Sequence, residues 1–165
     1  IIAEDLGVIT PDVREVMSEF GFPGMKLLLF AFGEDCPKNA YAPHNISRNS
    51  VVFTGTHDNN TVKGWFRHEA SPEEIGRFNS YIGRETHEDN VHREMCRLAM
   101  MCTADLAILP MQDILGLGSE ARMNLPSQKH GNWMWRLSPE LLTEEVAIRL
   151  RNMTALYGRT SEEDY

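Results

Sequence analysis

Two short apolar runs of the chain end on acidic residues. Ile1 to Ala3 leads directly into Glu4, and Val51 to Phe53 leads through a polar turn to Asp58. In a barrel of parallel strands, side chains at the carboxyl ends of the strands face one site. Two carboxylates delivered to one cleft in this way are the groups that glycoside chemistry requires. The spacing therefore favours chemistry on sugars.

The elements that must position these acids alternate between short apolar strands and helices. We expect four strands, at residues 1–3, 25–30, 51–54 and 105–109. We expect helices at residues 10–20, 61–69, from 71 onward, 87–102 and 138–157. A long polar loop is expected over 33–49. This order predicts an α/β fold with a parallel sheet and outer helices. Four such strands suit a small doubly wound sheet or half of an eight-stranded barrel.

Three of these helices carry recognisable start signals. Thr10 precedes Pro11 at the first helical position. A similar pattern, Ser-Pro-Glu, begins at Ser71 and at Ser138. A hydroxyl cap, proline at the first position and acids in the first turn favour a helix N-terminus. In the first helix, an apolar stripe is expected along one side. Its members are Val13, Met17 and Phe20.

Composition excludes several classes of protein. The chain has 165 residues, enough for one domain with a sizeable core. It has 24 acidic and 16 basic residues and no basic run, which argues against nucleic-acid binding. No stretch approaches the ~20 apolar residues of a membrane span. Cys36, Cys96 and Cys102 lack the spacing of a disulfide framework or a zinc site, so we expect buried thiols in a reducing cytoplasm.

The first residues suggest how the chain is organised. It opens inside an apolar run with no methionine before Ile1, although chain termini normally lie at the surface. We interpret residues 1–165 as a single fragment of a longer protein. The acidic tail, about residues 159–165, is expected to be frayed.

Six ordered motifs extend this reading. They are Ile2-Ala3-Glu4-Asp5-Leu6-Gly7, Gly21-Phe22-Pro23-Gly24-Met25-Lys26, Gly55-Thr56-His57-Asp58-Asn59-Asn60-Thr61, Leu109-Pro110-Met111-Gln112-Asp113-Ile114-Leu115-Gly116-Leu117-Gly118, Arg122-Met123-Asn124 and Gly131-Asn132-Trp133-Met134-Trp135-Arg136. In this order they resemble the 4-alpha-glucanotransferases, also called amylomaltases or disproportionating enzymes. The resemblance runs from Ile1 to about Gly158.

The resemblance implies a (β/α)8 barrel that transfers α-1,4-glucan segments with retention of configuration, without cofactor or metal. The fragment corresponds to the C-terminal half, about strands five to eight. Glu4 matches the family's general acid and base, and Asp58 its transition-state-stabilising aspartate. The family's nucleophile lies in an Arg-x-Asp motif on the preceding strand, which this sequence lacks. The chain alone is therefore expected to be inactive, and its open sheet edges favour self-association.

Several further residues are candidates for binding substrate. They are His57, Asn59, Lys26, Gln112, Asp113 and Asn124. Lys26 interrupts an apolar strand, so it should reach either a carboxylate or the mouth of the cleft.

Some residues keep two interpretations. Asp113 serves equally well as a helix cap, and Asp5 is expected to be structural. The rings of Trp133 and Trp135 suit core packing as well as sugar stacking, and core packing is favoured. Arg136 is expected to pair with a carboxylate.

The implied partners are α-1,4-glucans, maltooligosaccharides and glucose, together with the missing N-terminal half of the barrel. Nucleic acid, membrane and metal are not expected. The alternatives are a glucan-binding module without catalysis and a structural α/β domain without a site. An upstream Arg-x-Asp motif distinguishes the enzyme from the binding module, whereas the structural domain predicts no sugar binding.

Overall fold

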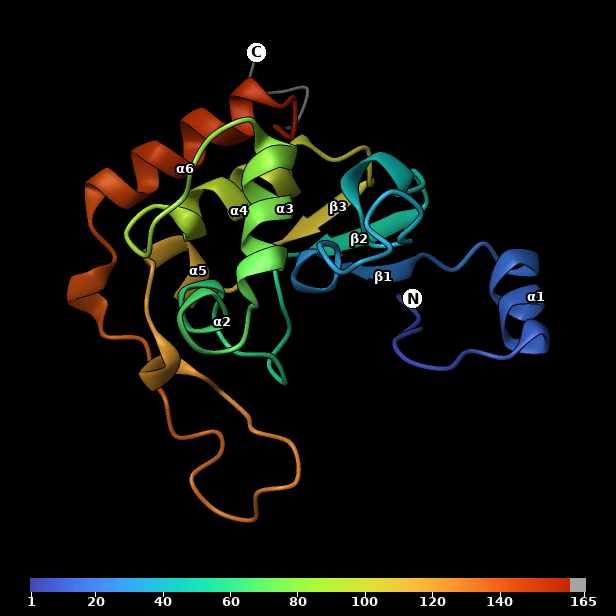
Figure 1. The fold of residues 1–165 in the computed structure, drawn as a ribbon, viewed down its shortest axis with the longest axis horizontal. Helices are drawn as coiled ribbons and strands as arrows, with labels where there is room; N and C mark the ends of the chain where they lie inside the picture. The colour runs from blue at the N-terminus through green and yellow to red at the C-terminus, as the bar shows by residue number, and fades with distance from the viewer. Residues whose placement is uncertain (161–165) are drawn as a thin grey trace.

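A three-stranded parallel sheet forms the centre of the computed structural model, which describes residues 1–160 (Figure 1). The strands are β1 (Gly24–Leu27), β2 (Ser50–Phe53) and β3 (Leu106–Ile108), in the order β1-β2-β3. Both neighbouring pairs are parallel, in the register Met25↔Val51 and Val51↔Leu106. The predicted α/β class with a parallel sheet is confirmed.

The first predicted strand is wrong. Ala3 forms only an isolated parallel bridge to Gly24, so the sheet of the described residues has three strands and not four. The Ala3 amide donates to the Pro23 carbonyl at 3.0 Å, but the next available amide on β1, that of Met25, donates to Asp5 Oδ1 at 2.7 Å. A side chain thus replaces the backbone ladder after one bridge. This contact confirms the structural role expected of Asp5.

β1 is also shorter than predicted. The sequence favoured a strand over residues 25–30, but Leu28–Phe30 forms a 3₁₀ helix. The Leu29 amide donates to the Thr54 carbonyl at 3.2 Å, so the chain turns across the end of β2. The long loop that follows agrees with the prediction and contains one 3₁₀ turn, Pro43–Asn45.

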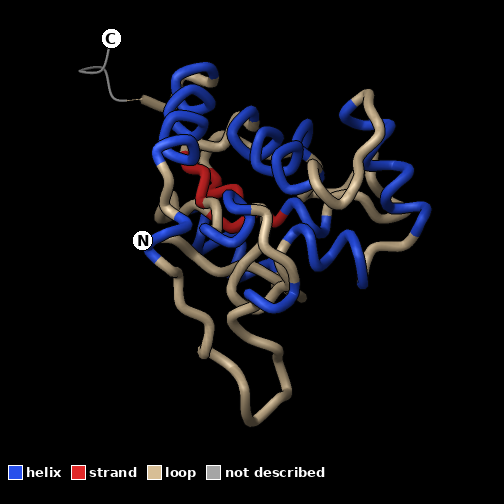
Figure 2. Tube along the Cα trace, turned by 90° about the vertical axis from the view of Figure 1, so that its left-hand side faces the viewer, coloured by secondary structure: helices blue, strands red, loops and turns tan. Residues whose placement is uncertain are grey.

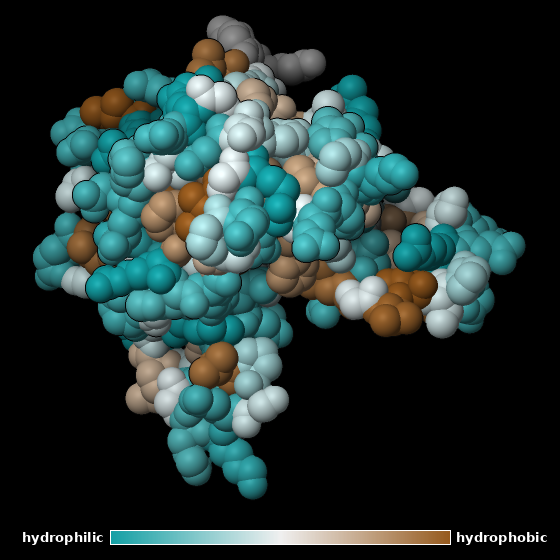
Figure 3. Space-filling view, in the orientation of Figure 1, coloured by the Kyte–Doolittle hydropathy of each residue, from teal (hydrophilic) through white to brown (hydrophobic). Residues whose placement is uncertain are grey.

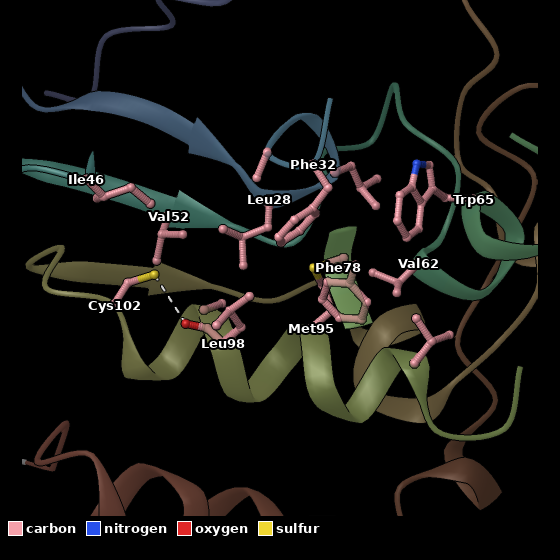
Figure 4. Close-up of a cluster of buried hydrophobic side chains, with 14 of the residues drawn as sticks. Leu28, Phe32, Ile46, Val52, Val62, Trp65, Phe78, Met95, Leu98 and Cys102 are labelled. Atoms are coloured by element: carbon pink, nitrogen blue, oxygen red, sulfur yellow. Dashed lines mark hydrogen bonds between the residues drawn. The ribbon is translucent and has the colours of Figure 1, made fainter. Parts of the chain in front are cut away.

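Three helices cover one face of the sheet. They are α2 (Val62–His68), α3 (Pro72–Ile82) and α4 (Val91–Met101). Figure 4 shows α4 running beneath the sheet, with side chains from the strands and helices interleaved between them. Val52 of β2, Phe78 of α3 and Met95 of α4 have no exposed surface. This layer is the hydrophobic core.

All three cysteines are buried thiols, as predicted. Cys102 lies within the core, where its Sγ donates to the Leu98 carbonyl at 3.2 Å (Figure 4). Burial raises the pKa of the Cys102 thiol to about 11 and also raises the pKa of Cys96. Both therefore stay protonated at neutral pH. A cytoplasmic location stays a prediction.

The opposite face of the sheet is less covered. Side chains alternate along a strand, so Val51 and Phe53 point away from Val52, and their register partners are Leu106 and Ile108. Leu106 is 50% exposed and Ile108 is 43% exposed. We call this surface, made of Phe53, Leu106 and Ile108, the open face.

The predicted start of α3 is confirmed in detail. Ser71 accepts a hydrogen bond from the Glu74 amide, while the Glu74 carboxylate accepts one from the Ser71 amide. This reciprocal capping box satisfies two backbone donors that the helix cannot pair internally. In α2, the Thr61 hydroxyl caps in the same position by accepting from Gly64.

The predicted start of the last helix is wrong. The Ser138-Pro139 signal begins only a 3₁₀ turn, Pro139–Leu141, and α6 runs over Glu144–Leu156. Leu142 has a non-helical backbone (φ −85°, ψ 69°), which separates the 3₁₀ turn from α6. Thr143 then supplies the cap by accepting from the Val146 amide.

The first helix, α1 (Pro11–Glu19), stands apart from the body of the molecule at the N-terminal side of β1 (Figure 1). None of its nine residues is buried. Val13 is 43% exposed and Phe20 is 64% exposed, so the predicted apolar stripe exists but is largely uncovered, although the Phe20 ring stacks on Phe22 at 5.6 Å. Figure 3 shows hydrophobic surface where α1 meets the body.

Two features after β3 were not predicted. A short helix, α5 (Met111–Leu115), follows the strand directly, and a 3₁₀ turn covers Ser119–Ala121. The chain then forms a long loop over residues 122–138, which projects from the body in two views at right angles (Figures 1 and 2). We call this segment the projecting loop.

The frayed tail, about residues 159–165, stays a prediction. Arg159 is anchored by donating to the carbonyls of Met100, Cys102 and Ala104 at 2.7–3.0 Å. Residues 161–165 of the predicted tail lie outside the described residues. Within residues 1–160, none of the helices has the length and apolar character needed to cross a membrane.

Candidate active site

The loop after β2 carries Asp58 and is shaped by its own side chains. Asn59 Oδ1 accepts hydrogen bonds from both the amide and the hydroxyl of Thr56, each at 2.8 Å. Thr61 caps α2 immediately afterwards. The polar run that the sequence placed in a turn is thus a tight loop between a strand and a helix start, and it presents His57 and Asp58 outward.

Asp58 is held at both its carboxylate and its backbone. The side-chain amide of Asn124 donates to Asp58 Oδ1 at 2.6 Å, and His57 Nε2 lies 3.5 Å from Oδ2. Arg122 donates to the Asp58 carbonyl at 2.7 Å. The carboxylate nevertheless stays half exposed. Its orientation is therefore fixed while one side remains open to a ligand.

Glu4, His57 and Asp58 line one cavity of about 220 Å³. Met25, Phe53 and Ile108 form part of its apolar wall, so the cavity lies at the carboxyl ends of the strands and borders the open face. Glu4 follows the isolated bridge at Ala3 and is exposed to solvent. Among the lining residues, all of which the structure describes, Glu4 and Asp58 supply the carboxylates.

A second cavity of about 140 Å³ lies beside the first and shares His57 with it. Its lining includes Asn59, Gln112, Asp113 and Arg122. Gln112 is 9% exposed and its amide donates to the Ala121 carbonyl at 3.2 Å. The structure thus places three more of the predicted binding residues beside His57, but Gln112 has little surface available to a sugar.

Asp113 is buried, with 2% of its surface exposed. One carboxylate oxygen accepts from the Thr54 hydroxyl, and the other accepts from the amide of Val62 at 2.7 Å. Val62 is the first residue of α2, so Asp113 caps that helix from a distance. Burial raises the pKa of Asp113 to about 6, although both hydrogen bonds act to lower it. Of its two interpretations, the geometry favours the cap.

Lys26 lies away from both cavities and lines neither of them. Its Nζ is 3.7 Å from Asp5 Oδ2 and 5.7 Å from the centre of the Tyr41 ring. The expected carboxylate partner of this strand lysine is thus Asp5. A role in binding substrate stays a prediction.

Sequence reasoning missed Arg122 at this site and favoured the core for Trp133. Arg122 was noted only as part of a motif. Its position two residues before the candidate binding residue Asn124 was the signal that could have identified it. Trp133 was expected in the core, which is wrong: it is 50% exposed, and its ring centre lies 5.1 Å from that of His57 at an interplanar angle of 37°. The projecting loop carries the ring outward to the histidine, away from the core.

The expected partner of Arg136 is also wrong. Its guanidinium donates to the carbonyls of Trp133 and Trp135 at 2.7 and 2.8 Å and reaches no carboxylate in the described chain. Trp133 itself has a positive φ of 62°, which is uncommon for a bulky residue. Arg136 thus stabilises the turn that holds the Trp133 ring.

No group of three or more His, Cys, Asp and Glu side chains within residues 1–160 is arranged to hold a metal ion. The site thus combines a parallel sheet, a cavity with two carboxylates near the carboxyl ends of its strands, and an aromatic ring beside His57.

Comparison with known proteins identifies the family. The profile of the 4-alpha-glucanotransferases matches residues 1–143, and the chain belongs to that family. The 4-alpha-glucanotransferase of Synechocystis sp. is 50% identical over 160 residues, which are 96% of this chain and 31% of the relative. The enzyme of Thermus thermophilus is 47% identical over 161 residues, covering 93% of this chain and 31% of the relative. The predicted resemblance is confirmed.

Solved structures agree. The amylomaltase from Streptococcus agalactiae, solved in complex with acarbose, superimposes with a TM-score of 0.91 at 34% identity, over 98% of this chain and 32% of that one. The amylomaltase of Corynebacterium glutamicum shares the fold, with a TM-score of 0.68 at 16% identity, over 93% of this chain and 28% of that one. The chain thus spans about 30% of the length of the relatives it matches.

Proposed function

We propose that the protein carrying this chain is a retaining 4-alpha-glucanotransferase. It would transfer an α-1,4-glucan segment to the 4-hydroxyl of an acceptor glucan or of glucose, through a covalent glucosyl-enzyme. The observation that carries the proposal is the shared cavity of Glu4 and Asp58 in a chain of this family. Retaining transfer needs an acid that later acts as a base, together with groups that stabilise positive charge at the anomeric carbon.

In this proposal Glu4 protonates the leaving glycosidic oxygen and then removes the proton of the acceptor hydroxyl. Its exposed position at the cavity supports this role, because the carboxyl must exchange protons with successive ligands. Asp58 holds a fixed negative charge near the sugar, where positive charge develops in the transition state. The hydrogen bond from Asn124 supports that role, since it fixes one oxygen while the carboxylate stays half exposed.

The nucleophile would come from outside this chain. The resemblance assigns it to an Arg-x-Asp motif on a preceding strand, and the cavity offers no third carboxylate among its described lining residues. We further propose that residues 1–165 form about strands five to eight of a (β/α)8 barrel. The exposed Leu106 and Ile108 support this arrangement, because the inner faces of barrel strands are normally covered by one another. The chain alone would then be inactive.

The substrates would be α-1,4-glucans, maltooligosaccharides and glucose. A relative of known structure is complexed with acarbose, which supports binding of such sugars by this protein as well. His57 and Asn59 are polar groups of the cavity walls that are placed to reach sugar hydroxyls, and Asn124 adjoins them through its hydrogen bond to Asp58. The Trp133 ring beside His57 offers a surface on which a glucosyl ring can stack.

Maltotriose disproportionation by the full-length protein tests this proposal. Glu4→Gln and Asp58→Asn are each expected to lower kcat at least about 10³-fold, because each removes a group that acts in the transition state. The matched controls are Glu34→Gln and Asp89→Asn, both on exposed side chains away from the two cavities. Loss of glucose release in the first pair only would support the enzyme. Glucan binding without transfer by the unaltered full-length protein would instead identify a binding module.

A further inference from the structure

Arg122 makes three different contacts around the loop that carries Asp58. Its Nε donates to the Asn124 carbonyl at 2.8 Å, one terminal nitrogen donates to Glu69 Oε1 at 3.1 Å, and the other donates to the Asp58 carbonyl at 2.7 Å. The side chain is only 19% exposed. A planar guanidinium can hold several acceptors at fixed angles, whereas an ammonium group acts as a single point charge.

These acceptors belong to three separate parts of the fold. Asp58 is in the loop after β2, Asn124 is at the start of the projecting loop, and Glu69 follows the end of α2. The backbone also links two of them, because the Asn124 amide donates to the His57 carbonyl at 3.0 Å. Arg122 is therefore the group that joins the helix layer to both sides of the site.

Glu69 extends the connection to the other end of the same loop. Its Oε1 accepts from the side-chain amide of Asn60 at 2.9 Å as well as from Arg122. The segment from Asp58 to Asn60 is thus fixed at both ends by a single carboxylate and a single guanidinium. An arginine side chain that donates to backbone carbonyls in this way can position the neighbouring residues without contacting the ligand itself.

We infer that Arg122 is a positioning residue for the reaction, setting the place of the Asp58 carboxylate and of the Asn124 amide that donates to it. This inference rests on the proposed function. Asn124 donates to Asp58 Oδ1 at 2.6 Å, so its carbonyl and its side chain are held by Arg122 and Asp58 respectively. A displacement of about 1 Å at a reacting group can cost about 10²-fold in rate, so precise placement has a measurable consequence.

Steady-state kinetics of the full-length protein with maltotriose tests the inference. Arg122→Gln is expected to lower kcat about 10²-fold and Arg122→Lys about tenfold, because lysine keeps the charge but cannot serve all three acceptors. KM should change less than about threefold in both, since the guanidinium nitrogens of Arg122 already donate to three protein acceptors. Glu69→Gln should lower kcat about threefold, because it weakens only one of the three contacts that Arg122 makes. Arg67→Lys, on an exposed arginine 3.5 Å from Glu88, is the matched control and should leave kcat unchanged.

Melting temperatures and crystal structures of the same variants separate the outcomes. Asp58 displaced in Arg122→Gln, with a lower kcat in the folded enzyme, supports the inference. A melting temperature that falls while kcat per folded molecule stays at the unaltered level would overturn it, as would an unmoved Asp58. If the unaltered full-length protein fails to transfer glucosyl units, the proposed function fails, while the crystal structures still decide whether Arg122 places Asp58.

Discussion

The two faces of the sheet differ in how well the chain covers them. On one face, α2, α3 and α4 bury a continuous core in which Phe78 and Met95 have no exposed surface. On the other, Leu106 and Ile108 are about half exposed, and away from the sheet Phe20, directly after α1, is also uncovered. The same chain thus contains one complete packing layer and one incomplete layer.

The site lies at the border between these regions, and its residues reflect both. Asp58 and Arg122 are fixed by hydrogen bonds that lead back to α2 and the covered face. Glu4 extends from a chain segment that has only one bridge to the sheet. The difference fits the proposal made above, in which this chain supplies one wall of the site and further protein supplies the other. Relatives about three times as long are consistent with that proposal.

Replacing one phenylalanine by alanine in each region should produce the largest difference in the free energy of unfolding. Phe78→Ala is expected to lower the free energy of unfolding by about 3–5 kcal/mol, because it leaves a cavity in a packed core. Phe20→Ala, at a site 64% exposed, should change it by less than about 0.5 kcal/mol. Urea denaturation followed by circular dichroism measures both. Similar losses at the two positions would contradict the division into covered and uncovered regions.

Buried titratable groups on the covered side should make stability depend on pH. Burial, with nearby Arg93 and Arg149, lowers the pKa of His92 from 6.5 to about 4. Between pH 4 and 6.5 the unfolded chain therefore binds a proton at His92 while the folded chain does not. The free energy of unfolding consequently falls as pH drops from 6.5 to 4, by up to about 3 kcal/mol from this residue. Asp113, whose pKa burial raises from 3.8 to about 6, acts in the opposite sense, because the folded form holds its proton longer.

Single variants should separate the two contributions. In His92→Gln, stability should decrease as pH rises from about 4 to 6, because only the Asp113 effect remains. In Asp113→Asn, stability should increase as pH rises from about 4 to 6.5. Denaturation midpoints across this range provide the measurement. Unchanged slopes in both variants would show that neither group titrates differently in the folded chain.

The open face should drive self-association of the 165-residue chain. Leu106→Glu places a charge on this apolar surface and is expected to weaken association about tenfold, or ~1.4 kcal/mol. Leu156→Glu, at a 72% exposed position on α6, is the control and should have no effect. Sedimentation velocity over a concentration series gives the dissociation constants. A monomer at every concentration would mean that the open face does not bind a second copy.

The smallest effect is expected at the ring beside His57. In the full-length protein, Trp133→Ala should raise KM for maltotriose about fivefold, corresponding to ~1 kcal/mol of lost stacking. The melting temperature should stay nearly constant, because the side chain is half exposed. Met134→Ala, at a neighbouring residue 73% exposed, controls for disturbance of the projecting loop. An unchanged KM in the first variant would exclude the ring from sugar binding.

The sequence alone determined the family and the parallel α/β class, and it singled out Glu4 and Asp58, which line one cavity. These depend on local patterns: apolar runs that end on acids, hydroxyl caps such as Ser71, and motifs in a fixed order. It also required either a carboxylate or the mouth of the cleft for Lys26, because an unpaired lysine inside an apolar strand is costly. Such inferences need only a residue and its immediate neighbours in the chain.

Only the tertiary structure decided which residues support that pair. Arg122 reaches Asp58 across 64 positions and Glu69 across 53, and Trp133 meets His57 from a separate loop. It also reduced the first strand to a single bridge at Ala3, since the Asp5 side chain takes the next backbone donor. The physical reason is that hydrogen bonds and packing depend on distance in space, and the spacing of residues along the chain carries no record of these long-range contacts.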